Sequence, residues 1–147
     1  MDIDKLREQL KIDEGIEHKI YLDHLGLKTC GIGHLCLEGE PEFDMPVGTP
    51  ISEERVNELF DEDVKIMVGE CEKLYPYFEE LPEEAQQIIC NMMFNLGRPR
   101  LSKFKMMKQA VDNRDWKEAA FQMKSSKWYS QVKNRADRLV NRMERIK

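Results

Sequence analysis

The chain has 147 residues, of which 41% are hydrophobic and 35% are charged, and its formal net charge is −5. This length is typical of one domain, and the hydrophobic fraction is sufficient to bury a core. No apolar run approaches the roughly 20 residues that a membrane-spanning helix requires, so a transmembrane helical protein is excluded. The aromatic and methionine content argues against a disordered chain.

Charge is distributed unevenly along the chain. Residues 98–147 contain 15 Lys and Arg and 5 Asp and Glu, a net charge of +10, whereas residues 1–97 contain 8 and 23, a net charge of −15. Either two solvated surfaces of opposite charge meet within one fold, or the basic part forms a face that binds a polyanion. The basic residues have helical spacing and do not cluster in a tail, which favours the first interpretation.

The four cysteines are predicted to be reduced thiols, because the polar N-terminus does not resemble an apolar secretory leader. Accumulation in the cytoplasm is the corresponding expectation. The pattern Cys30-x3-His34-x-Cys36 has no recognised zinc spacing. Core thiols and one hydrogen-bonded histidine are therefore favoured over a metal site.

The first half of the chain predicts a helix followed by a small antiparallel sheet. Apolar residues at three- and four-residue steps predict a helix over 3–13 that ends at Glu14. Two strands, 19–23 and 27–30, flank a turn that contains glycine. This register places Asp23 and Thr29 on the same face of the hairpin. A third strand is predicted over 34–37, and an exposed loop over 38–50 because of its prolines, glycines and acids.

The second half predicts helices almost throughout. Ser52 is a candidate N-cap for a helix that continues to about residue 71. The segment after Pro82 is apolar on nearly all sides and is the candidate central buried helix. Breaks are predicted near residues 75–76, 81–82, 97–99, 113 and 125–126, and the last helix begins near Lys133. The fold class is α+β, mainly helical.

Two carboxylates stand in unequal environments. Glu14 ends the first helix, and Asp23 lies at the turn of the hairpin, where solvent is close. Glycoside cleavage needs such a pair, because one carboxyl group protonates the leaving oxygen while the other assists the attack. In a chain with 28 acids, however, the spacing alone favours ordinary surface roles.

A resemblance changes that balance. The region that carries it comprises Ile12-Asp13-Glu14-Gly15, Lys19-Ile20-Tyr21-x-Asp23 and Gly26-x-x-Thr29-x-Gly31-Ile32-Gly33-His34-Leu35. This region resembles the active-site region of the phage-type lysozymes, and weaker matches extend over nearly the whole chain. The resemblance implies that Glu14 is the general acid and that Asp23 and Thr29 hold the attacking water. The implied reaction is hydrolysis, with inversion, of the β-1,4 bond between N-acetylmuramic acid and N-acetylglucosamine of peptidoglycan.

The resemblance also assigns supporting roles. Arg135 and Arg138 resemble the family's partners of Asp13 and Glu14, although exposed arginines on a helix are the alternative. His34 and Asp63 resemble a structural pair, in which pairing is expected to raise the pKa of the histidine. Leu35 and Phe94 match positions that line the sugar cleft. Gln122 stands at such a position where the family has Asn, and this exchange keeps the amide donor and acceptor.

The family fold implies two lobes around a cleft. The expected boundaries are a small lobe over 13–60, a helical lobe over 1–12 and 72–147, and a connecting helix over 52–71. The expected partner is peptidoglycan, with no cofactor, metal, nucleic acid or membrane insertion, and a monomer is expected. A lytic transglycosylase and a non-catalytic module that binds peptidoglycan or nucleic acid are the alternatives.

Overall fold

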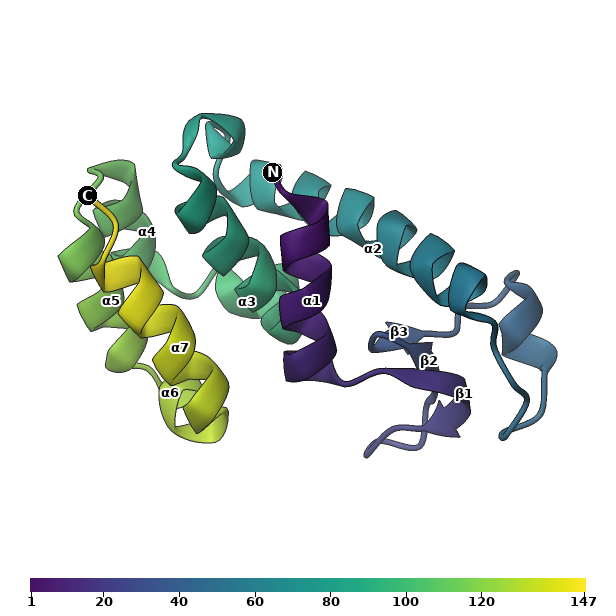
Figure 1. Cartoon of the computed structure of the whole chain (residues 1–147). Helices are drawn as coiled ribbons and strands as arrows, with labels where there is room; N and C mark the ends of the chain where they lie inside the picture. The colour runs from purple at the N-terminus through teal and green to yellow at the C-terminus, as the bar shows by residue number, and fades with distance from the viewer. The chain divides into compact units, whose positions relative to one another are not determined.

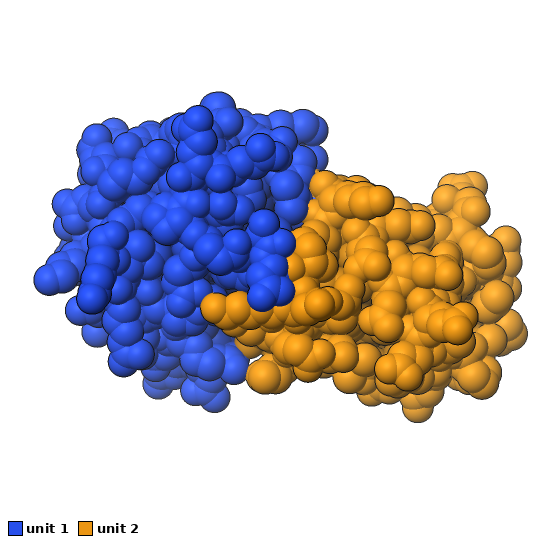
Figure 2. All heavy atoms as spheres, turned by 45° about the horizontal axis from the view of Figure 1, so that its top comes forward, with its two compact units in different colours: residues 1–2, 67–147 blue, residues 3–66 orange.

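The computed structural model describes all residues, 1–147, and divides into two compact units, residues 3–66 and residues 1–2 with 67–147 (Figure 2). The predicted α+β class is confirmed, with a small antiparallel sheet and predominantly helical structure elsewhere (Figure 1). None of the helices is both long and apolar enough to span a membrane. The helix α2, Glu53–Leu74, contributes residues to both units.

The unit of residues 3–66 contains the helix α1, Ile3–Glu14, and a sheet in the order β1, Glu17–Leu22, β2, Lys28–Gly31, and β3, His34–Leu35. Tyr21 pairs with Thr29 in the antiparallel β1–β2 hairpin, so the predicted register is correct. The third strand is shorter than predicted, since β3 ends at Leu35. The N–H of the next residue, Cys36, still donates to the carbonyl of Lys28, at 3.0 Å.

The segment before α2 is mostly exposed, as predicted, but it contains a 3₁₀ turn, η1, Pro41–Asp44, with one buried side chain, that of Glu42. The helix α2 begins as expected, since the hydroxyl of Ser52 accepts a hydrogen bond from the N–H of Arg55 at 3.1 Å. This bond satisfies one of the free N–H groups of the first turn.

The second unit is helical. Its elements after α2 are η2, Phe78–Glu80; α3, Glu83–Leu101; α4, Lys105–Asp112; α5, Trp116–Lys124; α6, Lys127–Gln131; and α7, Lys133–Glu144. The helix α5 packs against α4 and α7, which also contacts α3 (Figure 1). The helix α3 is the predicted buried helix, with most side chains from Ala85 to Leu96 inaccessible. It is interrupted at Gly97, whose φ of +75° is incompatible with a continuous helix.

Candidate active site

Glu14 is the last residue of α1, and its side chain is half-buried. The bend between β2 and β3 approaches it at Gly33, where a Cβ atom would lie 3.2 Å from Cβ and 3.5 Å from Oε2 of Glu14. Gly33 also has a φ of +61°, which side chains rarely adopt. Glycine at this position therefore gives the Glu14 side chain room beside the sheet.

Asp23 begins the hairpin turn and is fixed by the backbone of that turn. Its Oδ1 accepts hydrogen bonds from the N–H groups of Leu25, at 2.8 Å, and Leu27, at 2.9 Å. The bond from Leu27, supported by that from Leu25, lowers the pKa of Asp23. Asp23 is therefore an ionised acceptor at neutral pH, poorly suited to donate a proton.

Thr29 lies beside this turn on β2 and is buried. Its hydroxyl donates to the carbonyl oxygen of Leu27, at 3.0 Å, so Leu27 is held by Thr29 at its carbonyl and by Asp23 at its N–H. With its hydrogen directed to a carbonyl, Oγ1 of Thr29 offers lone pairs for a further hydrogen bond. Both side chains are thus acceptors at the same end of the hairpin.

Tyr21 is a residue of this region whose role the sequence does not indicate. Burial raises the pKa of its phenol, and the charges of Glu17, Glu14 and Asp23 raise it further. The protonated hydroxyl therefore lies within electrostatic reach of both candidate acids. The strand pattern could have indicated this, because side chains alternate between the two faces of a strand and positions 21 and 23 therefore share one face.

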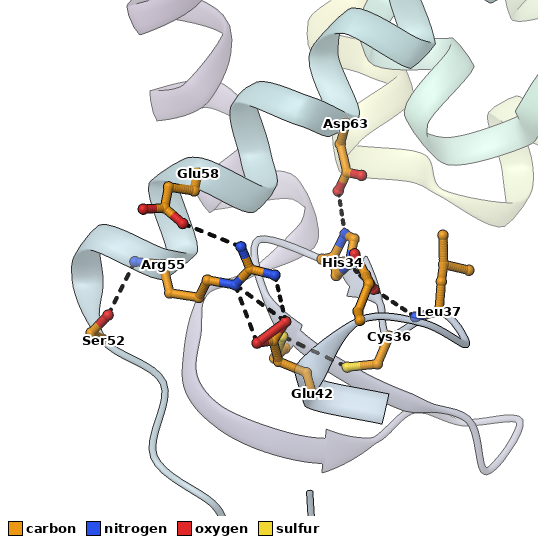
Figure 3. A network of polar contacts seen from close by, with 10 residues as sticks. His34, Cys36, Leu37, Glu42, Ser52, Arg55, Glu58 and Asp63 are labelled. Atoms are coloured by element: carbon orange, nitrogen blue, oxygen red, sulfur yellow. Dashed lines mark hydrogen bonds and ion pairs between the residues drawn. The ribbon is translucent and has the colours of Figure 1, made fainter. Parts of the chain in front are cut away.

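His34 is held between two carboxylates. Its Nδ1 lies 2.7 Å from Oδ2 of Asp63 on α2, and its Nε2 lies 2.9 Å from Oε1 of Glu40 (Figure 3). Burial by itself lowers the pKa of His34, but the hydrogen bonds to Asp63 and Glu40 outweigh burial and raise the pKa to about 9. We call these three residues the His34 clamp. The second carboxylate, Glu40, is not part of the predicted pair.

A second ion pair lies next to the clamp (Figure 3). Nη2 of Arg55 lies 2.7 Å from Oε1 of Glu42, and Nε donates to the same carboxylate. The hydrogen bonds from Arg55 lower the pKa of Glu42. The prediction of an exposed loop was wrong for this residue, which is 3% exposed. The two ion pairs attach the loop after β3 to the first turns of α2.

The candidate sugar contacts fall in both units. Leu35 is 44% exposed on β3, in the unit of residues 3–66. Phe94, on α3, and Gln122, on α5, are half-buried in the other unit. The amide of Gln122 donates to Oε1 of Glu118, at 2.9 Å, and lines a surface pocket of about 290 Å³ together with Met107.

The two arginines of α7 have different environments. Arg135 is buried, and it donates from Nε to Oδ1 of Asn91, at 2.9 Å, and from Nη2 to the carbonyl of Asn91, at 3.1 Å. The alternative of an exposed arginine is therefore wrong for Arg135. Arg138 is exposed.

The structure contains no group of three or more His, Cys, Asp or Glu residues arranged to hold a metal ion. All four cysteines are free and buried. Burial raises the pKa of Cys30 to about 12, and the neighbouring thiol of Cys36, with Sγ at 3.7 Å, adds to the effect. Thiols in this state are poor nucleophiles and poor metal ligands.

Comparisons with known proteins show which family the chain resembles. The family model described as "Phage lysozyme" matches residues 11–145. The chain is 29% identical over 161 aligned positions to "Probable T4-type lysozyme 2" of Dictyostelium discoideum, covering 97% of this chain and 95% of that protein. It is 31% identical to the "Pre-baseplate central spike protein Gp5" of Enterobacteria phage T4, covering 92% of this chain and 27% of that protein. It is 25% identical to "Peptidoglycan hydrolase gp36" of Pseudomonas phage phiKMV, covering 97% of this chain and 15% of that protein.

Proposed function

Because the chain belongs to the phage lysozyme family and is a glycoside hydrolase, we propose that it hydrolyses the β-1,4 bond between N-acetylmuramic acid and N-acetylglucosamine of bacterial peptidoglycan. The proposal includes inversion at the anomeric carbon, with Glu14 as the general acid and Asp23 with Thr29 as the residues that position water. The reaction needs two carboxyl groups and water, and it requires no cofactor.

The division of roles follows from the environment of Asp23. Two backbone N–H groups lower the pKa of this carboxylate, so it accepts hydrogen bonds and does not donate a proton to the substrate. Glu14 is the other carboxyl group of the pair. It therefore protonates the glycosidic oxygen as the bond breaks.

The observation that carries the proposal is the pair of acceptors around Leu27. A water molecule that donates one hydrogen to Asp23 and the other to Thr29 keeps a lone pair for attack. Asp23 then takes up the proton that this water loses. This arrangement suits a reaction in which the nucleophile is water, as inversion requires.

The remaining assignments belong to the same proposal. Leu35, Phe94 and Gln122 contact the sugars, and Arg135 and Arg138 support the acid. The enzyme acts as a monomer on the cell wall after release, without nucleic acid.

The test is hydrolysis of purified bacterial walls by Glu14→Gln and Asp23→Asn, with Glu17→Gln as the matched control because Glu17 is a nearby exposed acid. We expect the first two substitutions to reduce the rate by about 1,000-fold or more, with unchanged thermal unfolding, and the control to keep wild-type activity. NMR of the first product should show the α-anomer. A 1,6-anhydro product would show that the chain is a lytic transglycosylase and does not hydrolyse the bond. Walls that stay intact with the wild type would show that the chain only binds peptidoglycan.

A further inference from the structure

One surface of the second unit carries cations without anionic partners. Residues 98–111 include five Lys and Arg and no acid, and residues 119–136 include four and no acid. Some of these cations are neutralised locally, since Arg98 pairs with Glu70 and Lys108 with Asp112. Six others are exposed and make no side-chain hydrogen bond or ion pair, and four of these six line surface hollows: Arg100, Lys103, Lys105 and Lys127.

These four cations line two adjoining hollows. The first, of about 290 Å³, includes Lys103 and Lys105, and the second, of about 340 Å³, includes Arg100, Lys103 and Lys127. The first hollow also includes Gln122, the proposed sugar contact, which the substitutions below leave unchanged. The hollows share Lys103, Phe104 and Ser126, so we treat them as one continuous depression, which we call the basic furrow. Four cations in its lining favour a ligand with several anionic groups over a single small ion.

The lining of the basic furrow restricts the chemistry of this ligand. It contains no Asp or Glu, so it offers nothing to the ammonium groups of a zwitterionic peptide. It offers at most one ring for base stacking, that of the half-buried Phe104, because Trp128 is 3% exposed, lies edge-on to Phe104 and donates from Nε1 to Asn95. Cations, hydroxyl groups and an apolar floor suit a flexible polyanion without bases.

We propose that the basic furrow binds the polyol-phosphate polymers of bacterial walls, with the phosphodiester groups paired to Arg100, Lys103, Lys105 and Lys127. The choice of a wall polymer rests on the proposed function, whereas the demand for a repeating anion rests on the furrow itself. Such a site would serve a purpose, because residues 3–66 carry 7 Lys and Arg and 16 Asp and Glu, a net charge of −9. An anionic wall repels this unit, and the furrow offsets the repulsion.

The test measures binding of fluorescently labelled poly(glycerol phosphate) by anisotropy, using the triple variant Arg100→Gln, Lys103→Gln, Lys127→Gln. The matched control is Lys117→Gln, Arg145→Gln, Lys147→Gln, which removes the same charge from the same unit at positions outside both hollows. We expect the furrow variant to bind about 30-fold more weakly or worse, and the control to stay within threefold of the wild type. The slope of log affinity against log salt should become shallower by about 2 units in the furrow variant only.

Further measurements separate this proposal from the proposed function. On walls from which the polymer has been stripped, the furrow variant should hydrolyse peptidoglycan within threefold of the wild type, and a larger loss would assign the cations to hydrolysis and overturn the polymer site. Equal losses in the two triple variants, or tighter binding of single-stranded DNA or of a wall stem peptide than of the polymer, would also overturn it. Failure of the wild type to cleave stripped walls would refute the proposed function and leave the binding result intact.

Discussion

The His34 clamp gives a quantitative prediction about pH. In the folded chain His34 is 4% exposed, and Asp63 and Glu40 occupy its two ring nitrogens. The clamp raises the pKa of His34 to about 9, against about 6.5 for an unperturbed histidine. The folded state therefore binds a proton that the unfolded state releases at neutral pH.

The sign and size of the effect follow from this difference. Since the folded pKa is the higher one, the stabilisation is fully present below about pH 6.5 and is lost as pH rises through about 9. One pKa unit corresponds to about 1.4 kcal/mol, so a displacement from about 6.5 to about 9 contributes up to about 3 kcal/mol of unfolding free energy.

The variant His34→Asn removes the titrating ring, and His18→Asn is the matched control because His18 is exposed and makes no side-chain hydrogen bond or ion pair. Urea denaturation of the wild type and both variants at several pH values from 5.5 to 10, a range chosen to bracket about 6.5 and about 9, gives the free energies. The gap between wild type and His34→Asn should narrow by up to about 3 kcal/mol over this range. The control should differ from the wild type by less than about 0.5 kcal/mol throughout.

A constant gap between the wild type and His34→Asn across the whole range would refute the reasoning. It would mean that His34 has the same pKa in the folded and unfolded states, so that the clamp takes up no proton on folding. A gap that widens with pH would reverse the sign of the linkage, which the geometry of two acceptors around one ring does not allow.

Two more substitutions test the geometry of the smaller unit. The change Gly33→Ala should reduce activity at least about tenfold beyond its effect on stability, because the new Cβ crowds the candidate general acid, whereas Gly48→Ala, also at positive φ but with open space around it, should lower only stability. The change Glu42→Gln should cost about 2 kcal/mol at neutral pH, because Arg55 loses its main partner. That cost should shrink in acid, because the pKa of Glu42 is lowered in the folded state. The stabilisation by Glu42 is therefore fully present above about pH 4.3 and is lost as pH falls through the folded pKa. The control Glu58→Gln, at an exposed site, should cost less than about 0.5 kcal/mol.

Much of the fold was predictable because its signals are local. The cap of α2 depends on Ser52 and a backbone N–H three residues later, and the sequence shows this spacing directly. The hairpin register depends on the length of one turn, and the interruption of α3 depends on Gly97. In each case the cause and the structure lie within a few residues of each other.

The predictions that failed concern contacts between distant parts of the chain. Glu42 lies in a segment rich in proline, glycine and acids, a composition that predicts exposure. Its side chain is nevertheless buried, where it pairs with Arg55, 13 residues later. Glu40 likewise binds Nε2 of His34 because the chain turns back after β3. The composition of that segment does not predict the direction of this turn. Composition gives the polarity of a segment but not the partner that a single side chain meets.

The uneven distribution of charge is another case in which composition alone does not identify the partners of individual side chains. The excess of cations after residue 98 was compatible with paired, solvated helices or with a face for a polyanion. The first interpretation holds for some of these cations, and our proposal assigns the second to others. Arg142 pairs with Glu84, as Arg98 does with Glu70, and these cations are satisfied within the fold. Lys103 and Lys127 have no such partner and face a depression without acids, so an external anion is the counter-charge that this surface lacks.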